Sequence, residues 1–194
     1  MCSRFERQGK PKKTAERFDL EAPPEVPEQA EIRPTDPALV IREPGRAVFL
    51  TWGIPASWES KPLINARSET LTERKTFRPL LANRCLVPAT AYFEWRGVGR
   101  QRFKNRIAFA DDAPFAFAGL YTENAFTIIT CTPAAGIAHI HDRMPVILTR
   151  AAETAWLDPD RPFETLARYL IPYEERPLTA DKQIPPGTQR DLFA

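Results

Sequence analysis

Residues 84–95 decide the fold, and they read Arg84-Cys85-Leu86-Val87-Pro88-Ala89-Thr90-Ala91-Tyr92-Phe93-Glu94-Trp95. The two apolar and aromatic runs on either side of Thr90 are typical of buried β-strands. Glu94 lies inside the aromatic run, where a carboxylate is costly unless it is paired or functional. A buried carboxylate with a raised pKa is a candidate acid or base, and a salt bridge to a neighbouring arginine is the structural alternative.

Further strand-like runs lie on both sides of this stretch. We expect a hairpin from the runs 38–41 and 47–50, which flank turn residues at 43–46, and three strands at 103–110, 114–121 and 125–131. Short helices are expected at 14–20, from Glu69 after a Ser68 N-cap, from Thr149 to Trp156, and at 161–170. The pattern predicts a single β-rich α+β domain with a few peripheral helices.

The chain of 194 residues is long enough for one substantial core, and 43% hydrophobic residues is ordinary for a globular protein. We expect no membrane span and no signal peptide, because no run of eighteen apolar residues and no apolar N-terminal region occur. Cys2, Cys85 and Cys131 form no CxxC pair, which favours free thiols and a cytoplasmic location. Within strand runs, Cys85 and Cys131 are interpreted as packing residues.

Charge is unevenly distributed along the chain. Residues 61–106 carry eleven basic residues against three acidic ones, and residues 96–106 carry five basic residues and no acid. The second segment is expected to be a basic hairpin tip. Such segregation is typical of a basic face that binds a polyanion, although a merely solvated charged surface is the alternative.

The N-terminus offers a nucleophile. Removal of Met1 would leave Cys2 with a thiol and a free α-amine on adjacent carbons, with pKa values of about 8.5 and about 8. An aminothiol of this kind suits aldehydes, because the amine forms an imine and the thiol then closes a five-membered thiazolidine. An idle residue at a frayed terminus is the alternative.

Three other segments carry candidate site residues. His139 and His141 are the only histidines, and without a further ligand cluster we expect no metal and interpret a single histidine as a general acid or base. Asn65 and Arg67 precede a helix start, where an anion can bind, although Asn65 alone is also typical of a turn. Trp52 and Trp58 lie in a Gly/Pro loop and are either base-stacking residues or lids on the core.

Taken in order, seven short motifs resemble one family, that of the SOS-response-associated peptidases (SRAP). The motifs are Met1-Cys2-x-Arg4-Phe5, Trp52-Gly53, Asn65-Ala66-Arg67-Ser68-Glu69-Thr70, Arg84-Cys85-Leu86-Val87-Pro88-Ala89, Phe93-Glu94-Trp95, Ala118-Gly119-Leu120-Tyr121 and His141-Asp142-Arg143-Met144-Pro145. The resemblance runs from residue 1 to about residue 157. It implies an α+β fold with a curved mixed sheet or partial barrel around a basic cleft.

The resemblance also implies a function. Proteins of this family shield abasic sites in single-stranded DNA through a thiazolidine between the N-terminal cysteine and the ring-opened sugar. Carried onto this chain, it makes Cys2 the nucleophile, Asn65 a positioning group, and Glu94 and His141 the acid/base pair, with no cofactor. The positions that it implies for strand binding are Arg4, Trp52, Arg67 and Arg143.

It further implies an AP-lyase side reaction and an autoproteolytic removal of Met1. Two alternatives remain at this stage. One is an N-terminal-cysteine amidohydrolase or peptidase, although the Asn-Gly pair often found in its oxyanion hole is missing after Asn65. The other is a single-stranded DNA-binding module without chemistry, in which Cys2 is inert.

The C-terminal part is interpreted as a Pro-rich tail, so we predict a domain at 1–170 and a tail at 171–194. Within the tail, Gln189, Leu192 and Phe193 resemble the short peptide by which bacterial repair proteins bind the replication sliding clamp. An idle tail is the alternative. We expect a monomer, in the cytoplasm and associated with the nucleoid.

Overall fold

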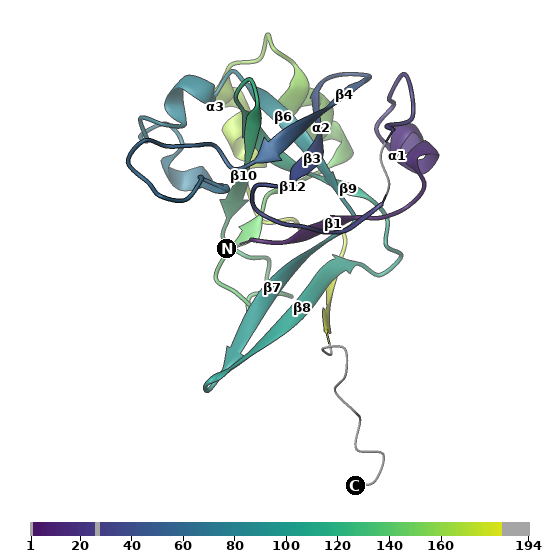
Figure 1. Cartoon of the computed structure of the whole chain (residues 1–194), viewed down its shortest axis with the longest axis vertical. Coiled ribbons are helices and arrows are strands. Elements are labelled where there is room, and N and C mark those ends of the chain that lie inside the picture. The colour runs from purple at the N-terminus through teal and green to yellow at the C-terminus, as the bar shows by residue number, and fades with distance from the viewer. Residues whose placement is uncertain (1, 26–27, 184–194) are drawn as a thin grey trace, which may run out of the picture.

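The computed structural model describes residues 2–25 and 28–183, and Figure 1 shows two sheets with short helices around one of them. The helices are α1 (Pro11–Arg17), α2 (Arg150–Leu157) and α3 (Phe163–Leu166), with 3-10 turns η1 (Ser68–Thr70), η2 (Arg78–Leu80) and η3 (Ala167–Tyr169). The strands are β1 (Phe5–Arg7), β2 (Gln29–Ile32), β3 (Pro37–Glu43), β4 (Arg46–Trp52), β5 (Asn65–Arg67), β6 (Arg84–Ala89), β7 (Ala91–Val98), β8 (Gln101–Phe109), β9 (Phe115–Tyr121), β10 (Ala125–Cys131), β11 (Met144–Pro145), β12 (Ile147–Leu148) and β13 (Leu178–Lys182).

The first sheet closes on itself. Its strands follow the order β10-β4-β3-β6-β9, and β9 pairs back to β10, so that five strands form a ring. The β10–β4 pair is parallel and the other four pairs are antiparallel. A ring of this kind leaves no free edge along its paired length. The expected β-rich α+β fold with a mixed, barrel-like sheet is thus confirmed.

The second sheet has the order β13-β8-β7-β1-β2 and is connected to the barrel through Thr90, which joins β6 directly to β7. The core lies between the two sheets. Phe5 of β1 contacts Trp52 and Phe117 edge-on, with ring centroids 5.0 and 5.8 Å apart. The β7–β8 hairpin extends away from the barrel (Figure 1), so its tip is free of the core.

Turn and cap chemistry explains a few of the element ends. Gly45 and Gly99 have φ values of +78° and +59° at the two hairpin turns, a conformation that glycine adopts without strain. The Thr149 side chain accepts a hydrogen bond from the amide of Ala152 and caps α2 as expected. The prediction that Ser68 is an N-cap was wrong. Ser68 lies inside η1, and Arg67 occupies the N-cap position without forming a side-chain hydrogen bond to the helix.

Strand β13 lies in the segment that we assigned to the tail. It pairs with β8 over five residues, from Leu178 opposite Phe109 to Lys182 opposite Asn105. The division at residue 170 stays a prediction. Gln189, Leu192 and Phe193 lie outside the described residues.

Residues of three neighbouring strands, β9, β10 and β5, are paired side by side near the N-terminus. Gly119 of β9 pairs with Ile128 of β10, and Ile128 pairs in turn with Asn65 of β5. A Cβ added at Gly119 would lie 2.8 Å from Cys85 Sγ and 3.0 Å from the carbonyl oxygen of Thr127. The absence of a side chain at 119 therefore lets β6 and β10 approach β9 closely at the level where β10 also pairs with Asn65.

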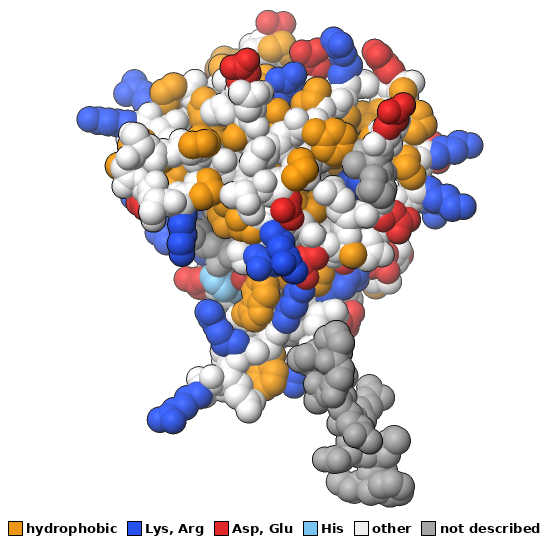
Figure 2. Space-filling model, in the orientation of Figure 1, with side chains coloured by type: hydrophobic (Ala, Val, Ile, Leu, Met, Phe, Trp, Pro, Cys, Tyr) orange, Lys and Arg blue, Asp and Glu red, His pale blue; other side chains and the backbone are white. Residues whose placement is uncertain are grey.

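Charged side chains are distributed differently over the barrel and the β7–β8 hairpin. Figure 2 shows Lys and Arg but few acidic side chains on the hairpin, whereas side chains of both signs lie at its junction with the barrel and over the barrel. Within residues 2–25 and 28–183, no helix is long and apolar enough to span a membrane.

Candidate active site

Cys2 lies just before β1 and is fully buried. Its carbonyl oxygen accepts a hydrogen bond of 2.6 Å from the Asn65 side-chain amide, and its thiol donates weakly to the carbonyl of Arg4 at 3.5 Å. Burial, and then the negative charge of Glu94, raise the pKa of the Cys2 thiol well above its ordinary value. The thiol is thus held in place as a neutral group, and it needs a base to become a nucleophile.

Glu94 is the candidate base. Its side chain is buried at the inner end of the β7–β8 hairpin, and Oε2 lies 3.9 Å from Nε2 of His141. Burial raises the pKa of Glu94 to about 7. A carboxyl group with this pKa is present in both protonation states near neutral pH, which suits it to accept and return a proton.

His141 comes from the loop before β11, far from Glu94 in sequence. Burial lowers the pKa of His141, so the ring is neutral at pH 7. Its Nδ1 lies 3.0 Å from the backbone amide of Arg143 and 2.8 Å from a carboxylate oxygen of Asp142. Nδ1 accepts the Arg143 amide N–H in one tautomer and donates to Asp142 in the other, and in both tautomers Nε2 faces Glu94.

Arg4 lies two residues after Cys2, directly before β1. Its Nε donates to Glu31 at 2.9 Å and its Nη1 donates to the carbonyl of Ser3 at 2.8 Å. Lys104 contacts the other oxygen of Glu31 at 2.6 Å. The partial burial of Glu31 opposes ionisation, but the bonds from Lys104 and Arg4 outweigh it and hold the pKa of Glu31 below its ordinary value.

Arg143 and Arg67 differ in exposure and in their partners. The Arg143 side chain is only 11% exposed, forms two bonds with Glu69 at 2.7 and 2.9 Å, and donates to the carbonyl of Thr130 at 2.6 Å. Arg67 is exposed at the end of β5, with no carboxylate of the described chain within ion-pair distance. Arg67 is therefore the more available cation of the two.

Trp52 is fully buried, with its indole N–H donating to the carbonyl of Ile64 at 2.9 Å and its ring against Phe5. No ring face is left on which a base could stack. The interpretation of Trp52 as a core residue fits this position, and its assignment to direct DNA contact does not. Trp58, by contrast, is 65% exposed in the loop after β4.

Asn65 thus bonds to Cys2, Glu94 lies beside His141, and the charge of Glu94 acts on the Cys2 thiol, so these four residues lie close together. Arg4, two residues after Cys2, pairs with Glu31. Sequence reasoning missed Glu31 and Glu69, which hold Arg4 and Arg143. Glu69 lies within a motif of the resemblance, whereas Glu31 lies in a Pro- and Glu-rich segment that carried no signal for pairing.

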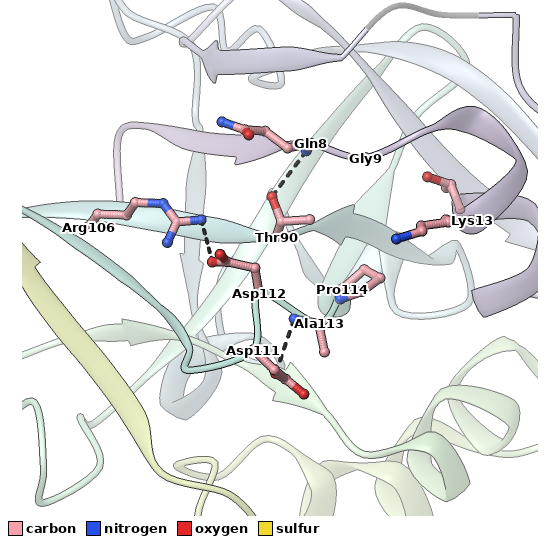
Figure 3. A pocket seen from close by; sticks show the side chains of 10 residues that line it. Gln8, Gly9, Lys13, Thr90, Arg106, Asp111, Asp112, Ala113 and Pro114 are labelled. Atoms are coloured by element: carbon pink, nitrogen blue, oxygen red, sulfur yellow. Dashed lines mark hydrogen bonds and ion pairs between the residues drawn. The ribbon is translucent and has the colours of Figure 1, made fainter.

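A polar pocket of about 370 Å³ lies at the other end of β1 and does not include the candidate site (Figure 3). Arg106 pairs across it with Asp112 at 2.8 Å, and the amide of Gln8 donates to the hydroxyl of Thr90 at 3.0 Å. The carboxylate of Glu6 also binds Arg106. Arg106 is therefore engaged by two carboxylates, and we assign the pocket no function.

Comparison with known proteins identifies the family of this chain. Residues 1–183 match the family described as SOS response associated peptidase (SRAP). The abasic site processing protein YoaM of Bacillus subtilis is 33% identical over 203 residues, covering 93% of this chain and 89% of YoaM. The abasic site processing protein YedK of Escherichia coli is 30% identical, covering 72% of this chain and 68% of YedK. A crystal structure of a protein from Bacteroides thetaiotaomicron has a TM-score of 0.82 and 26% identity, covering 93% of this chain and 91% of that one. The chain belongs to the SRAP family.

Proposed function

We propose that this protein processes abasic sites in single-stranded DNA by forming a covalent thiazolidine through Cys2 after removal of Met1. The names of its relatives YoaM and YedK support the substrate. The observation that carries the proposal is the convergence of Cys2, held by Asn65, with the Glu94–His141 pair at 3.9 Å.

The chemistry balances with one water released. The deoxyribose opens to its aldehyde when its C1′ hydroxyl loses a proton and the ring oxygen gains one. The α-amine of Cys2 adds to C1′, and loss of water gives an imine. The thiol then adds to the imine carbon, its proton passes to the nitrogen, and the five-membered ring closes.

Each site residue has a role in this sequence. The proposed role of His141 is to assist ring opening by proton transfer, and the lowered pKa of its ring and the position of Nε2 beside Glu94 support this role. Glu94, with a pKa of about 7, takes the thiol proton and returns it as the imine is attacked. Asn65 holds the Cys2 carbonyl, which fixes amine and thiol relative to the sugar.

Two further activities belong to the same proposal. The imine permits β-elimination of the 3′ phosphate, an AP-lyase reaction that competes with thiazolidine closure. Removal of Met1 is proposed as an autoproteolytic step, in which the Cys2 thiol takes the Met1 acyl group from its own nitrogen and water then hydrolyses the thioester. Mass spectrometry of Cys2→Ala, which should retain Met1 when freshly translated without an aminopeptidase, tests this step.

A denaturing gel tests the main proposal. Purified protein is incubated with a single-stranded oligonucleotide containing one abasic site, and a heat-stable adduct is expected. Cys2→Ala should lose this adduct, whereas an undamaged oligonucleotide of the same sequence should give none with wild type. An equally stable adduct with Cys2→Ala would rule out the thiazolidine.

We also propose that Gln189, Leu192 and Phe193 bind the bacterial replication sliding clamp, with the Leu-Phe pair filling an apolar pocket. A protein held at the fork and associated with the nucleoid would meet abasic sites as they become single-stranded. Titration of a labelled peptide of residues 184–194 with clamp should saturate in the micromolar range, and no saturation up to about millimolar would exclude it.

A further inference from the structure

Tyr92 carries a buried hydroxyl that no step of the proposed mechanism uses. The side chain is fully buried, lies opposite Phe5 in the β1–β7 pair, and has its ring centre 6.0 Å from that of Phe117. Among residues 2–25 and 28–183, the hydroxyl oxygen has no hydrogen-bond partner. A buried hydroxyl without a partner costs stability, so a tyrosine in a position that suits phenylalanine calls for a reason.

The backbone holds the Cys2 thiol against the part of β7 that carries Tyr92. Side chains two residues apart on a strand project to the same face, so Tyr92 and Glu94 share one face of β7. Phe93, between them, donates its amide N–H to the carbonyl of Arg4 at 2.9 Å. The same carbonyl accepts the Cys2 thiol at 3.5 Å. The sulfur therefore lies next to the backbone between Tyr92 and Glu94.

The sulfur loses its partner when it reacts. The thiol donates to the Arg4 carbonyl, but a thiolate can only accept, so the thiolate and this carbonyl repel each other. The carbonyl keeps the amide of Phe93 as its partner, and the sulfur can turn away without leaving it unpaired. The buried thiolate then needs a hydrogen-bond donor.

Tyr92 is suited to be this donor. Burial, and then the negative charges of Cys2, Glu94 and Cys131, raise the pKa of the phenol, so the hydroxyl keeps its proton at neutral pH. The same dependence on the Cys2 charge indicates that the sulfur and the phenol are close enough to interact. Asn65, which holds Cys2, gives its amide to the carbonyl oxygen and not to the sulfur.

We propose that the Tyr92 hydroxyl donates a hydrogen bond to the Cys2 sulfur while the thiazolidine closes, which makes Tyr92 a further catalytic residue. Glu94 takes the thiol proton, the sulfur forms its bond to C1′ of the imine, the electron pair of the C=N bond moves to the nitrogen, and the proton follows it there. Tyr92 keeps its own proton throughout and stabilises the negative sulfur by hydrogen bonding alone. This inference rests on the proposed function.

The first test needs no DNA, because the same bond stabilises the thiolate of the free protein. Tyr92→Phe removes the hydroxyl and keeps the ring. Alkylation of Cys2 by iodoacetamide near pH 8, followed by mass spectrometry of the N-terminal peptide, should slow by about 3- to 10-fold. The thiolate fraction falls by about 10-fold or more, and the higher nucleophilicity of a more basic sulfur offsets part of this loss.

Two controls separate this effect from a change in packing. Labelling of buried Cys85 in the same samples should stay at the wild-type rate. The Tm of Tyr92→Phe should equal or exceed that of wild type, because the variant no longer buries an unpaired hydroxyl. A hydroxyl that served packing would instead lower the Tm and expose Cys85 when removed.

The second test follows the imine on abasic DNA. Borohydride divides the imine between two products, the thiazolidine and a reduced amine that keeps a free thiol. In Tyr92→Phe the ratio of thiazolidine to reduced amine should fall by about 3- to 10-fold, because the amine step does not involve the sulfur. Tyr173→Phe is the matched control, since it removes a buried tyrosine whose ring packs on Phe109 at the end of β8. It should behave like wild type in both tests.

Alkylation of Cys2 in Tyr92→Phe at the wild-type rate would overturn the inference, as would an unchanged thiazolidine ratio or a lower Tm with faster labelling of Cys85. A wild type that forms no adduct with abasic DNA refutes the proposed function, and the alkylation rates then decide on Tyr92 by themselves. A wild type that forms the adduct while Tyr92→Phe is alkylated normally refutes this inference alone.

Discussion

Replacing Glu94 by Gln is expected to stabilise the DNA-free protein at neutral pH and to have little effect in acid. The pKa of Glu94 is about 7 in the folded protein against an ordinary value of 4.5. Between these pH values the folded state keeps a proton that the unfolded chain has released, so stability falls as pH rises and levels off above pH 7. At about 1.4 kcal/mol per pH unit, the lost stability is about 3 kcal/mol. Because a Gln side chain does not ionise at these pH values, the variant does not lose this stability as the pH rises.

The assay is thermal unfolding of wild type and Glu94→Gln from pH 4.5 to pH 8. For a chain of this size, about 3 kcal/mol corresponds to a Tm higher by roughly 6–12 °C for the variant at pH 8, shrinking towards zero at pH 4.5. Glu153→Gln is the control, because its carboxylate accepts two bonds from the mostly buried Arg17 at 2.9 and 2.7 Å. It should destabilise by roughly 2 kcal/mol or more. A Tm difference for Glu94→Gln that is independent of pH, or negative at pH 8, would refute the reasoning.

Three other predictions concern the site, the core and the tail. His141→Ala should slow crosslinking by about 100-fold or more at saturating abasic DNA, measured in single turnover, and an unchanged rate would remove His141 from the mechanism. Trp52→Ala should lower the stability by about 3–5 kcal/mol in denaturant unfolding, whereas exposed Trp58→Ala should change it by less than about 0.5 kcal/mol. Changing Leu192 and Phe193 to Ala should abolish clamp binding in a pull-down and leave crosslinking to naked DNA unchanged; loss of crosslinking would contradict a separate role for the tail.

Local chemistry made much of the fold predictable. Hairpins with glycine at the turn, as at Gly45 and Gly99, and a helix with Thr149 as its cap are determined by residues adjacent in sequence. The pairing of β13 with β8 was not predictable in this way, because the segment is polar, follows several prolines, and gains its strand only from hydrogen bonds to residues about 70 positions earlier. Ring closure of the barrel depends likewise on pairing between distant strands.

The candidate site was likewise predictable where local sequence carried the signal and unpredictable where distant residues meet. The residue types at Cys2, Glu94 and His141 indicated the chemistry proposed for them, and the order of the motifs predicted the family. Sequence could not show that Glu31 holds Arg4 and Lys104, since these partners are 27 and 73 positions apart and follow no local pattern. Burial separates Trp52 from Trp58 although both lie in similar Gly- and Pro-containing sequence.

The missing side chain at Gly119 has a consequence for engineering. Gly119, Ile128 and Asn65 are neighbours across the paired strands β9, β10 and β5, and a methyl group at 119 would lie 2.8 Å from Cys85 Sγ and 3.0 Å from the Thr127 carbonyl oxygen, so Cys85 or β10 would have to shift. Gly119 is thus linked to Asn65, and through it to Cys2, by the single intervening strand β10. Position 119 therefore offers an engineer of this scaffold a way to alter the packing next to Asn65 without replacing a residue of the candidate site.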